Sequence, residues 1–204
     1  IIFIFTEGSH IFTKTEELDK LNFGRLFSDP VWQPVSDNPK WGIIPLIIGT
    51  LKSAFVAIMF AVPVAVGAAI YTSEFAPRKV REFIKPIIEI LAGIPSVVMG
   101  FFALMVTATI VQDLFQSEYR LNAINSGFIL GVAIIPSIYS ISEDALTAVP
   151  KSFREASLAL GASKIQTSFL VILTTASSGI LSATILGLGR AVGETMIVLL
   201  SSGN

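Results

Sequence analysis

Residues 53–73 read SAFVAIMFAVPVAVGAAIYTS, a stretch that contains no Asp, Glu, Lys or Arg. A helix of about 20 predominantly apolar residues is long enough to cross the hydrocarbon core of a bilayer. Three further stretches of at least that length also lack all four charged residue types, at 90–112, 121–142 and 165–189. Together these stretches predict four membrane-spanning helices.

The composition of the 204 residues favours the same class of protein. Hydrophobic residues make up 52% and charged residues only 14%, whereas a soluble domain carries about 25% charged residues. The mean hydropathy of +0.75 also excludes intrinsic disorder. The lack of cysteine excludes disulfides and thiol chemistry in these residues, and the net charge of −1 gives no electrostatic reason to bind nucleic acid. We therefore expect an all-α, polytopic membrane helix bundle surrounded by the lipid bilayer.

The distribution of Lys and Arg among the connecting segments indicates how the bundle is oriented. Residues 74–89 contain four of these basic residues and 143–164 contain three, whereas 113–120 contain one. Cytoplasmic loops of membrane proteins concentrate Lys and Arg. The first two segments are therefore expected on the cytoplasmic side and the third outside, which places the N-terminal segment outside as well.

Both ends of the chain carry apolar runs that are too short to span a bilayer. Residues 1–5 are interpreted as the remnant of a first transmembrane helix, followed by an external loop over 6–42. Residues 43–204 are expected to form the core, with four transmembrane segments and a cytoplasmic loop at 143–167. On this interpretation the bundle is truncated at both ends.

Residue patterns typical of catalysis are missing from the sequence. The only histidine is His10, so these residues form neither an HExxH zinc site nor a Ser-His-Asp triad. No Gly-Lys dipeptide occurs, which excludes the Walker A loop that binds ATP. We expect a protein that is not an enzyme and that holds no metal or resident cofactor.

Residues 150–161, PKSFREASLALG, predict a short helix within the cytoplasmic loop. The proline suits the first turn of a helix and the glycine suits its end. Phe153, Ala156 and Leu160 share one face, at spacings of three and four residues. An apolar stripe of this kind fits the groove of a partner protein. A capped surface helix is the alternative interpretation of the same residues.

Proline and glycine residues within the spans predict kinks and close helix contacts. Because proline lacks an amide hydrogen, a kink or break is expected at three positions: Pro63, Pro95 and Pro136. Ser96 follows one of these prolines, where its hydroxyl either faces a transport pathway or bonds to its own helix backbone. GxxxG spacing permits close approach of helices, and it occurs at Gly127 and Gly131 and again at Gly189 and Gly193.

Two ionisable residues, Arg190 and Glu194, stand in the last apolar segment. An Arg at the bilayer centre costs about 2.5–3.5 kcal/mol on insertion scales. The i,i+4 spacing predicts that both side chains lie on one face of a helix, where each offsets the charge of the other. Two interpretations follow: an ion pair that fixes helix packing, or two charges that line a pathway, as intramembrane charges usually do.

Glu155-Ala156-Ser157, followed by Gly161, resembles the EAA loop of bacterial ABC importer permeases. Further matches lie at WGIIPLIIGTL (41–51), SEFAP (73–77), EILAGIPSVV (89–98) and GRAVGETM (189–196). These four segments are similar, in this order, to the PstC-type permease subunits of phosphate ABC importers. Where the EAA pattern continues with Ile-x-Leu-Pro, this chain has Thr174 in place of the proline.

The resemblance implies a type I ABC importer permease fold, a multi-pass position in the bacterial inner membrane and a role in ATP-driven phosphate import. The implied partners are a PstA-type permease subunit, a dimer of ABC ATPase subunits that binds the ATP, and an external phosphate-binding protein. The residues implied to couple to the ATPase are Phe153, Arg154, Glu155, Ala156, Leu160 and Gly161. The implied substrate pathway contains Arg190, Glu194 and Ser96.

In a phosphate carrier, Arg190 would attract the anion, because a guanidinium offers a planar fork of donors to oxyanions. Glu194 would accept a hydrogen bond from a protonated phosphate and so disfavour sulfate. A permease for another oxyanion, sulfate or molybdate, is the nearer alternative. An ion-coupled secondary transporter or a membrane scaffold is the more distant one.

Overall fold

The structure of the chain is a computed structural model that describes residues 27–33 and 40–202. The expected remnant of a first helix at 1–5 lies outside the described residues, as do the parts of the expected external loop at 6–26 and 34–39. The chain divides into two units, Ile1–Leu51 and Lys52–Asn204.

The first unit contains a short antiparallel strand pair that the sequence patterns did not predict. Strand β1 (Trp32–Gln33) pairs with β2 (Lys40–Trp41), with Trp32 opposite Trp41. The amide of Gly42 extends the pairing by donating to the carbonyl of Val31 at 3.1 Å. A Cβ at position 42 would lie 2.1 Å from the carbonyl oxygen of Asp29, so only glycine fits there. Helix α4 (Ile44–Ile70) begins two residues later and continues into the second unit.

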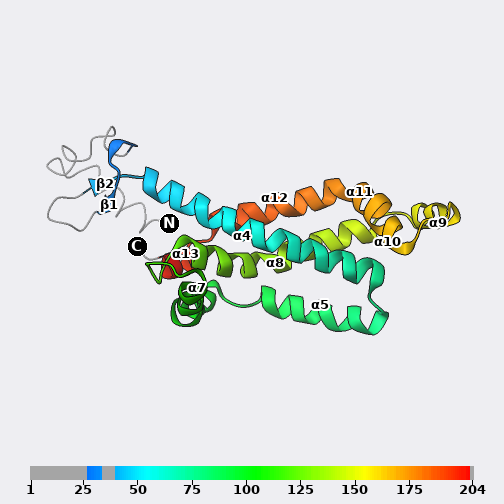
Figure 1. Ribbon diagram of the computed structural model, residues 1–204, viewed down its shortest axis with the longest axis horizontal. Coiled ribbons are helices and arrows are strands. Elements are labelled where there is room, and N and C mark those ends of the chain that lie inside the picture. The colour runs from blue at the N-terminus through cyan, green and yellow to red at the C-terminus, as the bar shows by residue number, and fades with distance from the viewer. Residues whose placement is uncertain (1–26, 34–39, 203–204) are drawn as a thin grey trace, which may run out of the picture. The chain divides into compact units, whose positions relative to one another are not determined.

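The second unit is built from helices (Figure 1). Several of these helices are continuous with π-helical turns. After α4 the elements run, in order, η1 (Tyr71–Phe75), α5 (Arg78–Ala92), α6 (Ser96–Phe102), η2 (Ala103–Thr107), α7 (Ala108–Phe115), α8 (Ala123–Thr147), α9 (Lys151–Ala159), α10 (Lys164–Gln166), η3 (Thr167–Ile172), α11 (Leu173–Thr175), α12 (Ser177–Gly193) and α13 (Met196–Ser202). The prediction of an all-α bundle is therefore confirmed for this unit.

Three helical stretches in the described residues are long and apolar enough to cross a membrane: Ile44–Phe75, Ser96–Phe115 and Ala123–Thr147. A fourth span results if the bent pair Lys164–Thr175 and Ser177–Gly193 is counted as one. The four predicted spans therefore correspond to three straight candidates and one bent one. Their ends differ from the predicted ends, because helices continue past charged residues such as Lys52 and Glu143.

The predicted span at 90–112 is divided in the structure. Residues 90–92 complete α5, and the next helix begins only at Ser96. Pro95 has an extended backbone (φ −60°, ψ 137°) and, like any proline, disfavours helix at the residue before it. Pro63 and Pro136, in contrast, lie inside continuous helices of 27 and 25 residues. Of these three prolines, only Pro95 therefore stands at a break.

The last apolar segment bends by 67° between α11 and α12, close to Thr174. No proline is present at this bend. Instead, the π-helical turn η3 precedes it, and the hydroxyl of Thr175 donates to the carbonyl oxygen of Val171 at 2.7 Å. Both features are known to bend helices. The chain thus bends next to the position where the EAA pattern has proline, by a different local mechanism.

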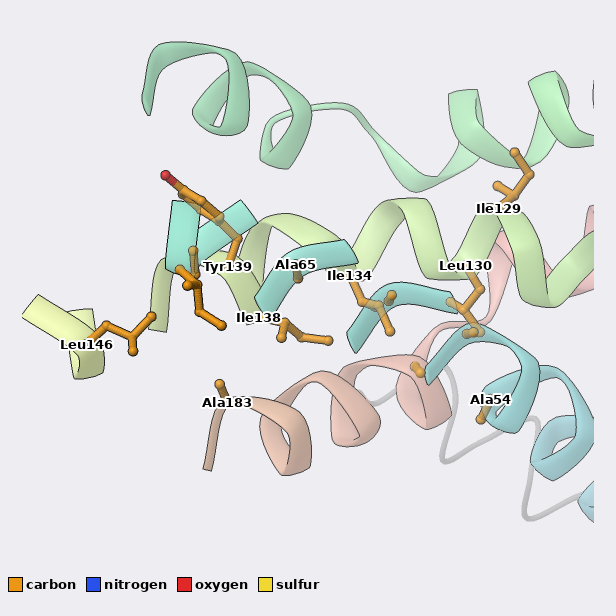
Figure 2. Close-up of a cluster of buried hydrophobic side chains, with 14 of the residues drawn as sticks. Ala54, Ala65, Ile129, Leu130, Ile134, Ile138, Tyr139, Leu146 and Ala183 are labelled. Atoms are coloured by element: carbon orange, nitrogen blue, oxygen red, sulfur yellow. The ribbon is translucent and has the colours of Figure 1, made fainter. Parts of the chain in front are cut away.

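Helices α4 and α8 pack closely because their facing side chains are small. On α4 the buried residues recur every three or four positions, at Ala54, Ala57, Ala61, Ala65 and Ala69. Figure 2 shows Leu130, Ile134 and Ile138 of α8 in the same cluster, with Ala183 of α12 beside them. Gly127 and Gly131 of α8 contact Val56 and Phe60 of α4, which confirms the predicted close contact. Gly189 and Gly193, in contrast, have no atom within 4 Å of an added Cβ.

Substitution of Gly127 by Ala tests this packing. The added Cβ would lie 2.5 Å from the Cβ of Val56, so we expect a loss of about 1–3 kcal/mol of stability, typical of an overpacked core. The matched control is Gly189→Ala, where the added methyl group meets open space. The measurement is the midpoint of thermal unfolding in detergent. Equal midpoints for the two variants would contradict the close packing of α4 and α8.

Candidate functional site

The three residues predicted to form the pathway come together around one cavity of about 180 Å³. Ser96, Arg190 and Glu194 line it, together with Leu91, Ile94, Met99, Ala133 and Ile197. The cavity lies beside two interruptions of the helices: one between α5 and α6, and one between α12 and α13. Its volume is several times the share of one water molecule in the liquid, which is about 30 Å³.

Of the two interpretations of Arg190 and Glu194, the ion pair is not found among the described residues, although both line the same cavity. Helix α12 ends at Gly193, and Glu194 is its C-cap residue (φ −81°, ψ 118°), after which the chain leaves the helix. Arg190 instead donates from Nη1 to the hydroxyl oxygen of Ser137 on α8 at 2.6 Å. Within the described part of the chain, the carboxylate of Glu194 has no hydrogen-bond or ion-pair partner.

Ser96 is the first residue of α6, directly after Pro95, and its side chain faces the cavity. Among the described residues its hydroxyl makes no bond to the backbone of its own helix, so it remains free to face the cavity. Ser137, the partner of Arg190, was missed in the sequence analysis. The available signal was a hydroxyl residue directly after Pro136 in an otherwise apolar stretch.

The residues that line the cavity therefore include Arg190, Glu194 and Ser96, and in the described part of the chain the guanidinium and the carboxylate form no ion pair with each other. The guanidinium of Arg190 is exposed and uses one nitrogen on Ser137, which leaves other N–H groups for a ligand. Guanidinium groups bind oxyanions through charge-assisted hydrogen bonds. A nearby carboxylate accepts a hydrogen bond, so this set of groups is suited to an anion that still carries a proton.

The second candidate site is the loop helix, α9, whose predicted position is confirmed. Pro150 is its N-cap residue and the helix covers Lys151–Ala159. Gly161 ends it with a φ of +86°, a conformation that glycine adopts without steric cost. The amide of Ala162 then donates to the carbonyl oxygen of Ser157 at 3.2 Å.

Five of the six predicted coupling residues are exposed on α9 and the residues after it: Phe153, Glu155, Ala156, Leu160 and Gly161. Leu160 is 89% exposed, an unusual state for a leucine at the end of a helix. Arg154 differs from the other five, because it turns towards the protein and its side chain is only 23% exposed. The free surface of α9 is therefore apolar at Phe153 and Leu160 and acidic at Glu155.

Comparison with known proteins places these features in a family context. Residues 61–202 match the family of binding-protein-dependent transport system inner membrane components. The chain is 37% identical to the probable ABC transporter permease protein YqgH of Bacillus subtilis, over 85% of this chain and 56% of the relative. It is 36% identical to the phosphate transport system permease protein PstC 1 of Mycobacterium tuberculosis, over 96% of this chain and 63% of the relative.

A third relative, the phosphate transport system permease protein PstC of Xylella fastidiosa, is 34% identical over 87% of this chain and 60% of the relative. The chain thus spans about 56–63% of the length of these relatives. It is also similar to two structures of the MetNI methionine ABC transporter in inward-facing conformations. Their TM-scores are 0.59 and 0.65, at 26% and 22% identity, covering 74% and 75% of this chain and 68% and 71% of theirs.

Thiol labelling tests the exposed surface of α9. The sequence contains no cysteine, so a single introduced thiol reports on one position. We expect Leu160→Cys to react with a water-soluble maleimide at least about ten times faster than Ser157→Cys, since opening of a buried site limits its rate. Position 157 is 9% exposed and position 160 is 89% exposed. Similar rates at the two positions would show that α9 does not lie as described.

Proposed function

We propose, because the chain belongs to the family of binding-protein-dependent transport system inner membrane components, that it is the PstC-type permease subunit of an ATP-driven phosphate importer. It is a multi-pass membrane protein of a transport family, and no step of the proposal assigns it covalent chemistry. In this role it forms half of a translocation pathway. The relatives named as phosphate transport permeases support the choice of substrate.

The observation that carries the proposal is the cavity that brings Arg190 and Glu194 together without an ion pair between them. Arg190 draws the anion into the pathway and holds it by hydrogen bonds, with Ser137 fixing the guanidinium. Glu194 accepts a hydrogen bond from the P–OH group of a protonated phosphate. Sulfate lacks that proton at neutral pH, so the same carboxylate repels it. The free carboxylate is therefore the proposed basis of selectivity.

The proposed partners follow from the two sites. A PstA-type permease completes the pathway, and an external phosphate-binding protein delivers the substrate. The exposed surface of α9 docks into a dimer of ABC ATPase subunits, which binds the ATP, so this chain needs no cofactor of its own. The complex lies in the bacterial inner membrane, with α9 on the cytoplasmic side because its loop is rich in Lys and Arg.

Uptake by the complete importer tests the proposed substrate site. Arg190→Lys removes the planar fork of donors, and we expect phosphate uptake to fall at least about tenfold, equivalent to about 1.4 kcal/mol. Glu194→Gln removes the repulsion of a fully deprotonated anion, so sulfate should inhibit phosphate uptake more strongly than in the wild type. The measurement is the accumulation of radiolabelled phosphate, with sulfate and molybdate as competitors.

The matched control for these variants is Arg78→Lys, because the side chain of Arg78 is 91% exposed and does not line the cavity. Its uptake should equal that of the wild type. Wild-type uptake and selectivity in both Arg190→Lys and Glu194→Gln would contradict the proposed site. Preferred uptake of sulfate or molybdate by the wild type would assign the permease to another oxyanion, and uptake without the ATPase would indicate a secondary transporter.

Protection from labelling tests the proposed docking of the ATPase. Binding of the ATPase dimer should slow the reaction of Leu160→Cys with maleimide at least about tenfold. The groove of the ATPase would then cover position 160 and exclude water and the reagent from it. Tyr119→Cys is the control, since Tyr119 is 69% exposed in the loop between α7 and α8. Its labelling should not change. Equal protection of both positions, or of neither, would argue against docking through α9.

A further inference from the structure

Arg154 connects the loop helix to the end of α4, although the two residues that meet there are 80 positions apart in sequence. Its Nη2 lies 2.6 Å from Oε1 of Glu74 on η1, and its Nε lies 3.2 Å from each of the two carboxylate oxygens. This arrangement uses two nitrogens of the guanidinium on one carboxylate. Such bidentate pairs fix geometry as well as charge.

The same guanidinium also binds the end of α8. Nη1 donates to the carbonyl oxygen of Val149 at 2.7 Å, and Nη2 donates to that of Leu146 at 3.0 Å. Carbonyl groups at the C-terminus of a helix lack partners within that helix. One side chain of α9 thus joins the ends of α4 and α8, and most of its hydrogen-bond donors are occupied.

Glu74 is itself held in place. The carbonyl groups of Thr72 and Ser73 accept hydrogen bonds from Arg81 of α5 at 2.6–3.0 Å. The hydroxyl of Tyr139 on α8 lies 3.1 Å from that of Thr72. The end of α4 is therefore bound to both α5 and α8, so a force applied at Glu74 acts on a well-supported part of the bundle.

Burial distinguishes this ion pair from an ordinary surface pair. The side chain of Glu74 is 7% exposed and that of Arg154 is 23% exposed. The nearby pair of Arg78 and Glu82 has a comparable distance of 2.9 Å but is 91% and 64% exposed. Surface pairs are screened by salt and contribute little, whereas partly buried pairs are screened much less. The Glu74–Arg154 pair is therefore suited to hold α9 and the end of α4 together when α9 moves.

A second connection leaves the same side of α9, three residues further along the helix. The hydroxyl groups of Ser157 and Thr167 lie 3.0 Å apart, and both residues are buried. This contact joins α9 to η3, which belongs to the first part of the last apolar segment. The loop helix is therefore attached to the bundle at two points, one charged and one neutral.

We propose that the Glu74–Arg154 pair is a mechanical joint that carries movement of α9 directly to α4. Arg154 is then a positioning residue within this chain rather than a contact to the ATPase. This proposal rests on the proposed function, in which the ATPase moves α9. The pair carries movement from α9 to α4, and the contact of Ser157 with Thr167 carries it through η3 to α12. The family resemblance by itself does not imply the connection to α4.

The first test measures the joint in the full-length permease alone. Glu74→Gln removes the charge and keeps the shape of the side chain. We expect hydrogen–deuterium exchange of the amides in Lys151–Ala159 to rise at least about fivefold, because local opening becomes easier. Glu82→Gln is the matched control and should leave this exchange unchanged. Unchanged exchange in Glu74→Gln would overturn the proposal, and this test needs neither the ATPase nor phosphate.

The second test measures transmission in the complete importer reconstituted in vesicles. We expect Glu74→Gln to recover the ATPase normally and to hydrolyse ATP, while the anion taken up per ATP falls at least about fivefold, as expected when binding and movement are uncoupled. Wild-type stoichiometry in this variant would overturn the proposal. A wild-type importer that takes up no phosphate would contradict the proposed function. The hydrogen–deuterium exchange of Glu74→Gln would still show whether the Glu74–Arg154 pair holds α9 in place.

A cross-linking variant separates loss of the joint from loss of folding. Glu74→Cys with Arg154→Cys removes the pair, and no other cysteine is present in these residues. A flexible bifunctional maleimide should restore the uptake per ATP in the same preparation, and the monofunctional reagent should not. Full coupling of this double variant before cross-linking would overturn the proposal.

Discussion

The need of the backbone for hydrogen bonds in a medium without water determines where this protein can place its polar groups. Irregular backbone at membrane depth is tolerated only where it is buried in protein or lines a cavity. The chain interrupts its helices at 93–95 and at 194–195, and both interruptions border the same cavity. Ser96 and Glu194 lie at these interruptions. The candidate substrate site therefore occupies the region in which helical hydrogen bonding is already broken.

Helix α8 connects this cavity with the loop helix. Ser137 holds Arg190 at the cavity, Tyr139 contacts the end of α4, and the carbonyl group of Leu146 accepts a hydrogen bond from Arg154. The glycines that face α4 keep the two helices in close contact. In the proposed mechanism, a displacement of α9 acts on α4 through Glu74 and reaches α8 through the carbonyl group of Leu146. In this account the substrate site lies beside the middle of α8 and the coupling site lies at its C-terminal end.

The spans, the loop helix and the grouping of Ser96 with Arg190 and Glu194 could be predicted because apolar length, capping residues and charges within apolar segments are local properties of a sequence. The predicted stretches stopped at Lys52 and Glu143, but the helices continue past both residues. A charged residue therefore ends a charge-free stretch without ending the helix. The spacing left open whether Arg190 and Glu194 form an ion pair, because it shows neither that α12 ends at Gly193 nor that Arg190 binds Ser137 on another helix. The inward turn of Arg154 depends on a residue 80 positions away and has no local signature.

The central claim is that Arg190 and Glu194 remain separate in order to bind a protonated oxyanion between them. The most direct measurement is a crystal structure of the complete importer with arsenate, a protonated analogue of phosphate whose arsenic atom can be located by anomalous scattering. The account predicts the arsenic peak inside the cavity, with arsenate oxygens at hydrogen-bond distance from the guanidinium and from the carboxylate. An ion pair between Arg190 and Glu194, with arsenate bound elsewhere in the pathway, would contradict it.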